Sequence, residues 1–167
     1  YHHSLMVANL AEAAAEAIGV NALLARVSAY FHDVGKLVKP GFFSENIQFR
    51  DNPHDQLSPS MSTLVIISHV KEGVGLALQH KLPSPLVDAI LEHHGTSLVS
   101  FFYHKASAQP EFDFGPSSAR EAQFRYPGPK PHSRHTAILT LADAVEAASR
   151  SLDKITPGHI ESLVACI

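Results

Sequence analysis

The stretch NALLARVSAYFHDVGKLV, residues 21–38, decides the fold class of this chain. Its apolar residues recur at steps of three and four, which is the period of an amphipathic α-helix. Asn21 stands just before the first apolar residue and is a typical helix N-cap. The stretch therefore predicts a helix over 21–38, with His32 and Asp33 together in a segment whose pattern calls for a buried core.

Helical patterns also account for most of the remaining chain. Three segments begin with an N-cap residue followed by Pro, a pair that favours the start of a helix: Ser58-Pro59, Ser84-Pro85 and Thr156-Pro157. The predicted helices span 4–19, 21–38, 59–80, 85–95, 97–108, 133–152 and 157–165. The sequence contains no alternating strand pattern, internal repeat or glycine-rich phosphate loop, so it predicts an all-α fold.

Two long segments lack this periodicity. Residues 39–57 are rich in Pro, Gly, Asn and Asp and predict an irregular loop. A loop of that length in a compact domain is usually functional or disordered. Residues 109–132 hold several prolines and few aliphatic side chains, and they predict a flexible, proline-rich excursion from a single domain over 1–167.

The composition restricts the class of protein. A chain of 167 residues with 45% hydrophobic and 17% charged residues is typical of one globular domain. The net charge of -3 argues against a binder of DNA or duplex RNA, because no basic surface dominates. The single cysteine, Cys166, cannot form an internal disulfide, which suits a reducing compartment.

Membrane and targeting segments are not predicted. The longest apolar run, 64–78, is interrupted by His69, Lys71 and Glu72, and it is shorter than a bilayer span. The chain opens on Tyr1 without an initiator methionine, so we expect it to be a piece of a longer protein.

Residues of the types that bind metals stand on five predicted helices or at their ends: His3, His32, Asp33, His69, His93, His94 and Asp143. Singly, most have an ordinary explanation; His3 suits a solvated chain end, and a histidine near a helix C-terminus is favoured by the helix dipole. Asp143 is harder to explain, because a charge within an apolar stripe is costly unless it is paired or metal-bound. Helix bundles commonly assemble metal sites from such scattered side chains.

In chain order, His3, His32-Asp33 and Asp143 resemble the H…HD…D signature of the HD-domain phosphohydrolase superfamily, whose members are helical, metal-dependent phosphoesterases. The additional histidines His69, His93 and His94 resemble the binuclear branch of that superfamily, and HDVGK fits its HDxGK form. Longer stretches, including ENIQFRDNPHDQLSP, EHHGT, FRYPGPKP and LADAVEAASRSL, are similar to the cytoplasmic HD domain of PgpH-type seven-transmembrane cyclic-di-AMP phosphodiesterases.

The resemblance implies an HD-domain helical bundle with a binuclear metal site at its centre. One divalent ion would be held by His3, His32, Asp33 and Asp143, and the other by Asp33, His69, His93 and His94. Asp33 would then bridge the two ions and be catalytic, and His2 remains an alternative to His3. Transition metals are implied, with iron or manganese favoured, although imidazole and carboxylate ligands do not identify the metal.

The activity implied is hydrolysis of cyclic di-AMP to linear 5′-pApA by a hydroxide that bridges the metals. Lys36 is either an ion-pair partner of a ligating carboxylate or a catalytic contact to phosphate. Candidate substrate contacts are Lys36, Phe43, Asn52, His54, Tyr103, Tyr126 and Lys130. Several of these have the alternative explanation of loop anchors or core residues.

Three other functions stay open. An HD-GYP-like cyclic-di-GMP phosphodiesterase would use the same ions, but no GYP tripeptide follows HDVGK. A mononuclear HD nucleotidase would leave three of the histidines unexplained, and a non-catalytic nucleotide-sensing module would be expected to lack ligands.

The resemblance also implies a cytoplasmic domain of a protein anchored in the bacterial membrane, with membrane and sensor regions outside this chain, and it leaves a homodimer open. His135 stands where the family pattern has an acidic residue.

Overall fold

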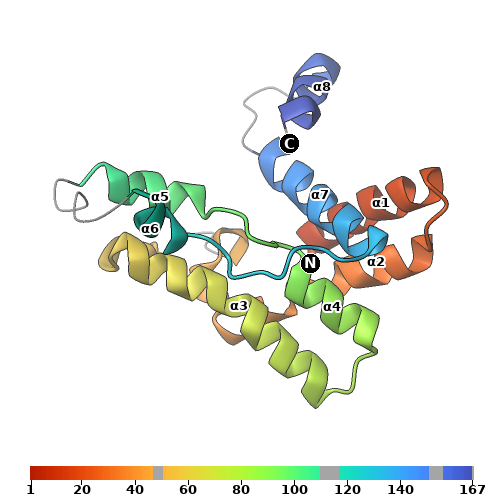
Figure 1. Ribbon diagram of the computed structural model, residues 1–167, viewed down its shortest axis with the longest axis horizontal. Coiled ribbons are helices and arrows are strands. Elements are labelled where there is room, and N and C mark those ends of the chain that lie inside the picture. Colours follow the sequence, from red (N-terminus) through yellow and green to blue (C-terminus); the bar gives the residue numbers. More distant parts are fainter. Residues whose placement is uncertain (47–50, 110–116, 151–155, 167) are drawn as a thin grey trace.

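The computed structural model describes residues 1–46, 51–109, 117–150 and 156–166 (Figure 1). The α-helices are α1 (His2–Ala17), α2 (Ala22–Phe31), α3 (Pro59–Gln79), α4 (Ser84–Glu92), α5 (Ser100–Ser107), α6 (Ser117–Ala122), α7 (Arg134–Ser149) and α8 (Pro157–Cys166). Four short 3-10 helices lie between α2 and α3: η1 (Val34–Val38), η2 (Pro40–Phe42), η3 (Ser44–Asn46) and η4 (Pro53–Gln56). Over these described ranges there is no strand beyond one isolated bridge, so the all-α prediction is confirmed.

Two separate apolar cores hold the helices together. The larger core joins α1, α2, α4 and α7, which pack closely because most of its members are alanines: Val7, Ala8, Ala11, Ala15, Ala25, Ala29, Ala89, Ile138, Leu139 and Ala142. The smaller core joins α5 to the segment after α6 through Phe102, Ala106 and Phe124. In Figure 1 α1, α2 and α7 lie on one side and α3, α5 and α6 on the other, with α4 between them.

The predicted helix starts are confirmed at three of four positions. Asn21, Ser58 and Thr156 each accept a hydrogen bond from the backbone N–H three residues later, as N-cap residues do. The prediction for Ser84 is wrong. Pro83 is the N-cap of α4, because its φ of -58° and ψ of 147° already give the extended conformation that an N-cap needs, and Ser84 is the first helical residue.

The predicted helix over 21–38 is interrupted. α2 ends at Phe31, Asp33 has a φ of -100°, and the chain continues as η1. The cause is a close approach to α3, since a Cβ atom on Gly35 would lie 1.8 Å from the backbone oxygen of His69. Asp33 therefore stands at the junction of two elements and not in the middle of one helix.

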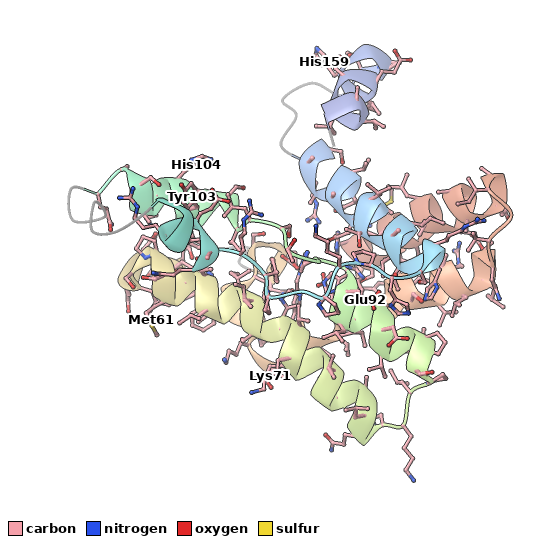
Figure 2. All side chains as sticks on the ribbon, in the orientation of Figure 1. Met61, Lys71, Glu92, Tyr103, His104 and His159 are labelled. Carbon is pink, nitrogen blue, oxygen red and sulfur yellow. The ribbon has the colours of Figure 1, made fainter. Side chains whose placement is uncertain are left out.

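α3 is a bundle helix that carries a buried histidine. Among the described residues it is the one helix long and apolar enough, by length and composition alone, to cross a bilayer, which the sequence analysis did not predict. Core helices of globular domains pass the same test. α3 packs against η1, α4 and α5, it buries His69, and it exposes Met61 and Lys71 on its outer side (Figure 2).

The described part of the 109–132 segment returns to the bundle. Residues 110–116 lie outside the described residues, so the flexibility expected for the whole segment stays a prediction. Further on, the Val99 N–H donates to the Phe124 carbonyl at 2.7 Å, and the buried Glu92 carboxylate accepts from the His132 N–H at 3.1 Å. The first contact ties the segment after α6 to the start of α5, and the second ties the residues before α7 to the C-terminal end of α4.

Candidate metal centre

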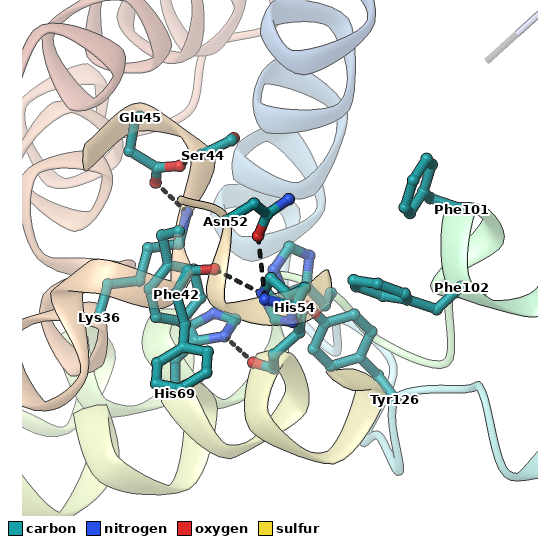
Figure 3. A pocket seen from close by; sticks show the side chains of 13 residues that line it. Lys36, Phe42, Ser44, Glu45, Asn52, His54, His69, Phe101, Phe102 and Tyr126 are labelled. Carbon is teal, nitrogen blue, oxygen red and sulfur yellow. Dashed lines mark hydrogen bonds and ion pairs between the residues drawn. The ribbon is translucent and has the colours of Figure 1, made fainter. Parts of the chain in front are cut away.

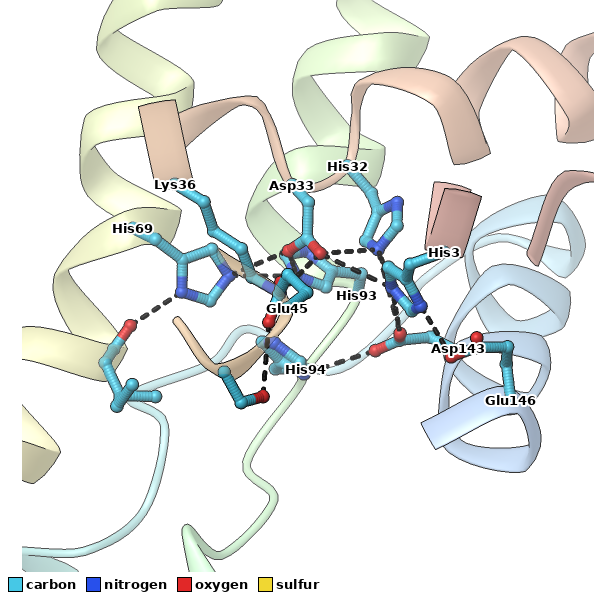
Figure 4. A network of polar contacts seen from close by, with 12 residues as sticks. His3, His32, Asp33, Lys36, Glu45, His69, His93, His94, Asp143 and Glu146 are labelled. Atoms are coloured by element: carbon cyan, nitrogen blue, oxygen red, sulfur yellow. Dashed lines mark hydrogen bonds and ion pairs between the residues drawn. The ribbon is translucent and has the colours of Figure 1, made fainter. Parts of the chain in front are cut away.

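Seven side chains from five helices and their ends meet between the two cores (Figure 4). α1 supplies His3, the end of α2 supplies His32 and Asp33, α3 supplies His69, the end of α4 supplies His93 and His94, and α7 supplies Asp143. These are the seven residues that the sequence analysis predicted as metal ligands. His2, the alternative to His3, is exposed on α1.

Asp33 stands at the centre of this group. Its Oδ2 atom lies 3.4 Å from His3 Nε2 and 3.3 Å from His32 Nε2. Its Oδ1 atom lies 3.4 Å from His69 Nε2 and 3.7 Å from His93 Nε2. The two oxygens of one carboxylate thus face two different sets of ligands.

The first half-site consists of His3, His32 and Asp143. Asp143 Oδ1 lies 3.1 Å from His3 Nε2 and 3.7 Å from His32 Nε2, and the two Nε2 atoms are 3.3 Å apart. All three residues are buried. Their ligand atoms are therefore close enough to bind one ion together.

The second half-site consists of His69, His93 and His94. The Nε2 atoms of His69 and His93 are 3.2 Å apart, and the ligand atoms of the three rings and of Asp33 all lie within 4.8 Å of one another. The ring of His94 stacks on Tyr126, with centroids 4.2 Å apart at 30°. This contact holds His94 at the entrance to the group.

The outward-facing nitrogens of three histidines are bonded to their own helices. The Nδ1 atoms of His32, His69 and His93 lie 2.7, 2.6 and 2.8 Å from the backbone oxygens three residues earlier. A carbonyl only accepts, so each Nδ1 carries a proton, and in the uncharged form of each ring Nε2 presents a lone pair to the centre. This is the tautomer that a metal-bound histidine needs.

His3 has a different outer partner. Its Nδ1 atom lies 2.5 Å from Oε2 of Glu146, a buried carboxylate on α7 that also accepts from Arg150 Nη2 at 2.6 Å. The sequence analysis missed Glu146. The available signal was its position three residues after Asp143, which places both carboxylates on one face of α7.

The donor set fits divalent metal ions. Asp33 Oδ1 is buried and has no hydrogen-bond partner among the described residues, although buried carboxylate oxygens normally have one. It faces imidazole lone pairs, which cannot donate to it in the tautomer described above. A cation bound between these atoms satisfies the oxygen and the lone pairs together, and imidazole with carboxylate is a ligand set of transition metals.

The first half-site attracts positive charge. Burial lowers the pKa of His3, but hydrogen bonds and charge interactions with Asp143 and Asp33 outweigh it and raise the pKa to about 9. His32 responds in the same way to the same carboxylates, and its pKa is raised to about 10. Burial also raises the pKa values of Asp33 and Asp143, but their histidine partners hold both well below the usual range.

The second half-site is neutral. Burial is the main cause that lowers the pKa values of His69 and His93, and it lowers that of His94 to about 3. Carboxylates oppose this effect but do not reverse it, because the charge of His32 also lowers the pKa of each of the three rings. The three rings are therefore uncharged at neutral pH, as metal ligands must be.

Lys36 is close to the ligands and charged. Its Nζ atom lies 2.6 Å from Asp33 Oδ2 and 2.7 Å from Glu45 Oε1. Burial lowers the pKa of Lys36, but the Asp33 and Glu45 carboxylates outweigh it and raise the pKa. The ion pair with a ligating carboxylate, one of the two predicted roles, is present; the phosphate contact stays a prediction.

A cavity of about 460 Å³ opens beside the second half-site (Figure 3). Five of the predicted substrate contacts line it: Lys36, Phe43, Asn52, His54 and Tyr126. Phe101 and Phe102 also line it and were not predicted, because the sequence pattern of a short helix does not show which residues face a cavity. We call this the aromatic cavity.

A second cavity, of about 280 Å³, opens beside the first half-site, and we call it the polar cavity. Its lining includes His3, Asp143 and Arg150. Two predicted substrate contacts line neither cavity. Tyr103 packs against Phe124 in the smaller core, and Lys130 is exposed in the segment before α7. A substrate contact by Tyr103 or Lys130 therefore stays a prediction.

Comparisons with known proteins agree with this architecture. The family model described as the HD domain matches residues 1–148. The chain is 52% identical over 164 residues to the cyclic-di-AMP phosphodiesterase PgpH of Bacillus subtilis, and 44% identical over 165 residues to that of Listeria monocytogenes. Each match covers 98% of this chain but 22% of the relative, so the chain spans about a fifth of the length of these curated relatives.

A solved structure is similar over the whole fold. The crystal structure of the L. monocytogenes phosphodiesterase PgpH HD domain in complex with cyclic di-AMP has a TM-score of 0.91 and 44% sequence identity to this chain. The match covers 99% of this chain and 75% of that one. The arrangement of helices around the seven ligands is therefore shared with a domain that binds a cyclic dinucleotide.

Proposed function

This chain belongs to the HD-domain family, and from that premise we propose that it is a metal-dependent phosphodiesterase that hydrolyses cyclic di-AMP to linear 5′-pApA. The observation that carries the proposal is the position of Asp33, whose two carboxylate oxygens each face a separate half-site. Similarity to relatives named as cyclic-di-AMP phosphodiesterases supports the choice of substrate.

We propose that the site holds two divalent ions, with iron or manganese favoured. Asp33 would bridge them, the first half-site would complete the coordination of one ion, and the second half-site that of the other. When bound, such ions supply Lewis acidity and a nucleophilic water at neutral pH. No side chain is then needed as a nucleophile.

The chain's own residues would hold and orient the substrate. The backbone carbonyls behind His32 and His69 fix those rings, so that the phosphodiester meets a rigid set of ligands. Lys36 carries a positive charge beside Asp33 and faces both cavities, where it can neutralise charge that develops on the phosphate oxygens in the transition state. Lys36 is thus proposed as a catalytic residue.

A cyclic-di-GMP phosphodiesterase of the HD-GYP kind remains the principal alternative, because the same ligand set would serve it. A non-catalytic sensing module is disfavoured, since all seven ligand residues are present and within reach of one another. The relatives are much longer than this chain, which supports the proposal that it is a cytoplasmic domain of a larger, membrane-anchored protein.

The test is turnover by the metal-loaded domain. Cyclic di-AMP, cyclic di-GMP and deoxynucleoside triphosphates are incubated separately with the protein, and the products are followed by chromatography. We expect conversion of cyclic di-AMP to 5′-pApA at a higher kcat/KM than that of cyclic di-GMP. Turnover of another substrate without turnover of cyclic di-AMP would overturn the proposed specificity.

A further inference from the structure

The aromatic cavity contacts the proposed metal site directly. His69 and His94 of the second half-site lie in its lining together with Lys36, so a ligand in the cavity reaches the ions without any movement of the backbone. A volume of about 460 Å³ is in the range of sites that take small organic ligands. The cavity is thus placed to hold the part of a substrate next to the reacting phosphate.

Aromatic rings form a continuous wall along one side of this cavity (Figure 3). Phe42 and His54 have ring centroids 5.4 Å apart, His54 and Phe102 4.9 Å, and Phe102 and Phe101 5.1 Å. Tyr126, stacked on His94, adds a further ring to the lining. Neighbouring rings in this row are inclined by 72°, 50° and 81°, so a nucleobase that enters here can stack on the face of one ring at a time.

Phe101 is the member of this wall that the fold does not need. Its neighbour Phe102 is 6% exposed and belongs to the smaller core, whereas Phe101 is 69% exposed although it lines the cavity. An exposed phenylalanine contributes little to folding, because most of its surface stays in water. A stacked base would cover that surface.

The charge in the cavity is arranged for a nucleotide. Lys36 supplies a cation at the end next to the ligands, where a phosphate would lie, and the opposite end is apolar. The polar cavity, among the described residues that line it, offers no phenyl or phenol ring. The two nucleosides of a cyclic dinucleotide would therefore meet different surroundings, and stacking would hold one of them.

We infer that the aromatic cavity is a nucleobase subsite and that Phe101 is a substrate-binding residue that stacks on one purine of the substrate while its phosphate lies at the proposed metal site. This inference rests on the proposed function for the identity of the dinucleotide. It requires only that a purine nucleotide binds, so it can be tested with a mononucleotide that the protein need not hydrolyse.

The experiment compares two ligands in the metal-loaded domain by calorimetry. 5′-AMP carries a phosphate and a purine, and ribose 5-phosphate carries the same phosphate without a base. Phe101→Ala should weaken the binding of 5′-AMP by at least about fivefold, the low end for the loss of one base–aromatic stack. The affinity for ribose 5-phosphate should stay unchanged. Phe101→Tyr should retain the wild-type affinity for both. The matched control is Leu23→Ala, because Leu23 is equally exposed at 68% and lies outside both cavities.

Kinetics give a second readout. If cyclic di-AMP is turned over, Phe101→Ala should raise KM and leave kcat unchanged, since a stack present in both ground and transition states contributes uniform binding. Unchanged 5′-AMP affinity in Phe101→Ala would overturn the inference. An equal loss of affinity for 5′-AMP and ribose 5-phosphate, or the same loss of 5′-AMP affinity in Leu23→Ala, would also overturn it. Failure of cyclic di-AMP turnover in the wild type would instead count against the proposed function alone.

Discussion

The two half-sites share Asp33 but differ in charge and in support. In the first, buried histidines face two carboxylates, and their pKa values are raised to about 9 and about 10. In the second, three histidines face each other, and burial lowers their pKa values. Identical side chains therefore become proton-binding in one place and neutral in another, because the carboxylates outweigh burial in the first half-site and burial outweighs the carboxylates in the second.

The support behind the rings differs in the same way. His3 in the first half-site is bonded to the Glu146 carboxylate, whereas His69 and His93 in the second are bonded to backbone carbonyls. A carboxylate partner makes an imidazole a stronger electron donor to a metal than a carbonyl does. A substitution at Glu146 should therefore change the metal affinity of the first half-site, whereas the backbone carbonyls behind His69 and His93 cannot be changed by substituting a side chain.

The largest expected effect comes from removing what the half-sites share. Asp33→Ala should lower kcat/KM for cyclic di-AMP by at least about 10³-fold, because several kcal/mol of charge stabilisation by two ions are lost together. The matched control is Asp55→Ala, since the Asp55 side chain is 71% exposed and Asp55 belongs to neither half-site. If the Asp33→Ala variant kept most of its activity, the proposed role of Asp33 as the ligand shared by both ions would be contradicted.

Breaking one half-site at a time should separate the two ions. His32→Ala deletes a ligand of the first half-site and His93→Ala a ligand of the second, and both rings are fully buried. We expect each variant to bind one ion per chain in place of two, measured by plasma mass spectrometry after dialysis. Loss of both ions in both variants would mean that the half-sites do not bind independently.

Glu146→Gln should sharpen the contrast between the half-sites. The amide keeps the size of the carboxylate but removes its charge, so the ion held with His3 should bind about 10- to 100-fold more weakly. The ion of the second half-site, where backbone carbonyls support His69 and His93, should keep its affinity. Competitive titration with a metal chelator distinguishes the two steps, and equal weakening of both would contradict a local role for Glu146.

The smallest expected effect is on pH dependence. A histidine with a raised pKa is protonated in the metal-free fold below that pKa, so an ion must displace its proton. Between pH 6.5 and about 9 the affinity of the first half-site should rise with pH, whereas that of the second should change little. Calorimetry at pH 7.5 in buffers of different ionisation enthalpy should detect the release of about two protons when the domain binds its metal ions. If no proton were released, the charge assigned to His3 and His32 would be contradicted.

The same shift has the opposite sign for the stability of the metal-free domain. Because the pKa of His3 is raised from 6.5 to about 9, its contacts with the carboxylates stabilise the fold fully below pH 6.5. That contribution is lost as the pH rises through about 9. Denaturant unfolding at pH 6.5 and 9 checks it, and an unchanged free energy of unfolding would contradict it.

The sequence predicts most of the helices and the residues of the candidate metal centre because both have local signals. N-cap residues such as Asn21 and Ser58 bond to their own helices, and metal-ligand types in apolar stripes are visible without knowledge of the fold. The break after Phe31 has no such signal. It depends on the contact between Gly35 and the backbone of α3, which are far apart in sequence.

Residues that support the site were missed for a related reason. Glu146 reads as an exposed helix residue until α1 brings His3 against it. Phe101 and Phe102 are neighbours in sequence, but only Phe102 packs into the smaller core. Long-range packing decides these roles, and periodicity within one helix does not report it.

Anomalous X-ray diffraction from crystals of the metal-loaded domain tests the central claim most directly. We predict two anomalous peaks per chain, one among His3, His32 and Asp143 and one among His69, His93 and His94, with one oxygen of Asp33 bound to each. A single peak, or two peaks of which only one contacts Asp33, would contradict a binuclear site bridged by Asp33.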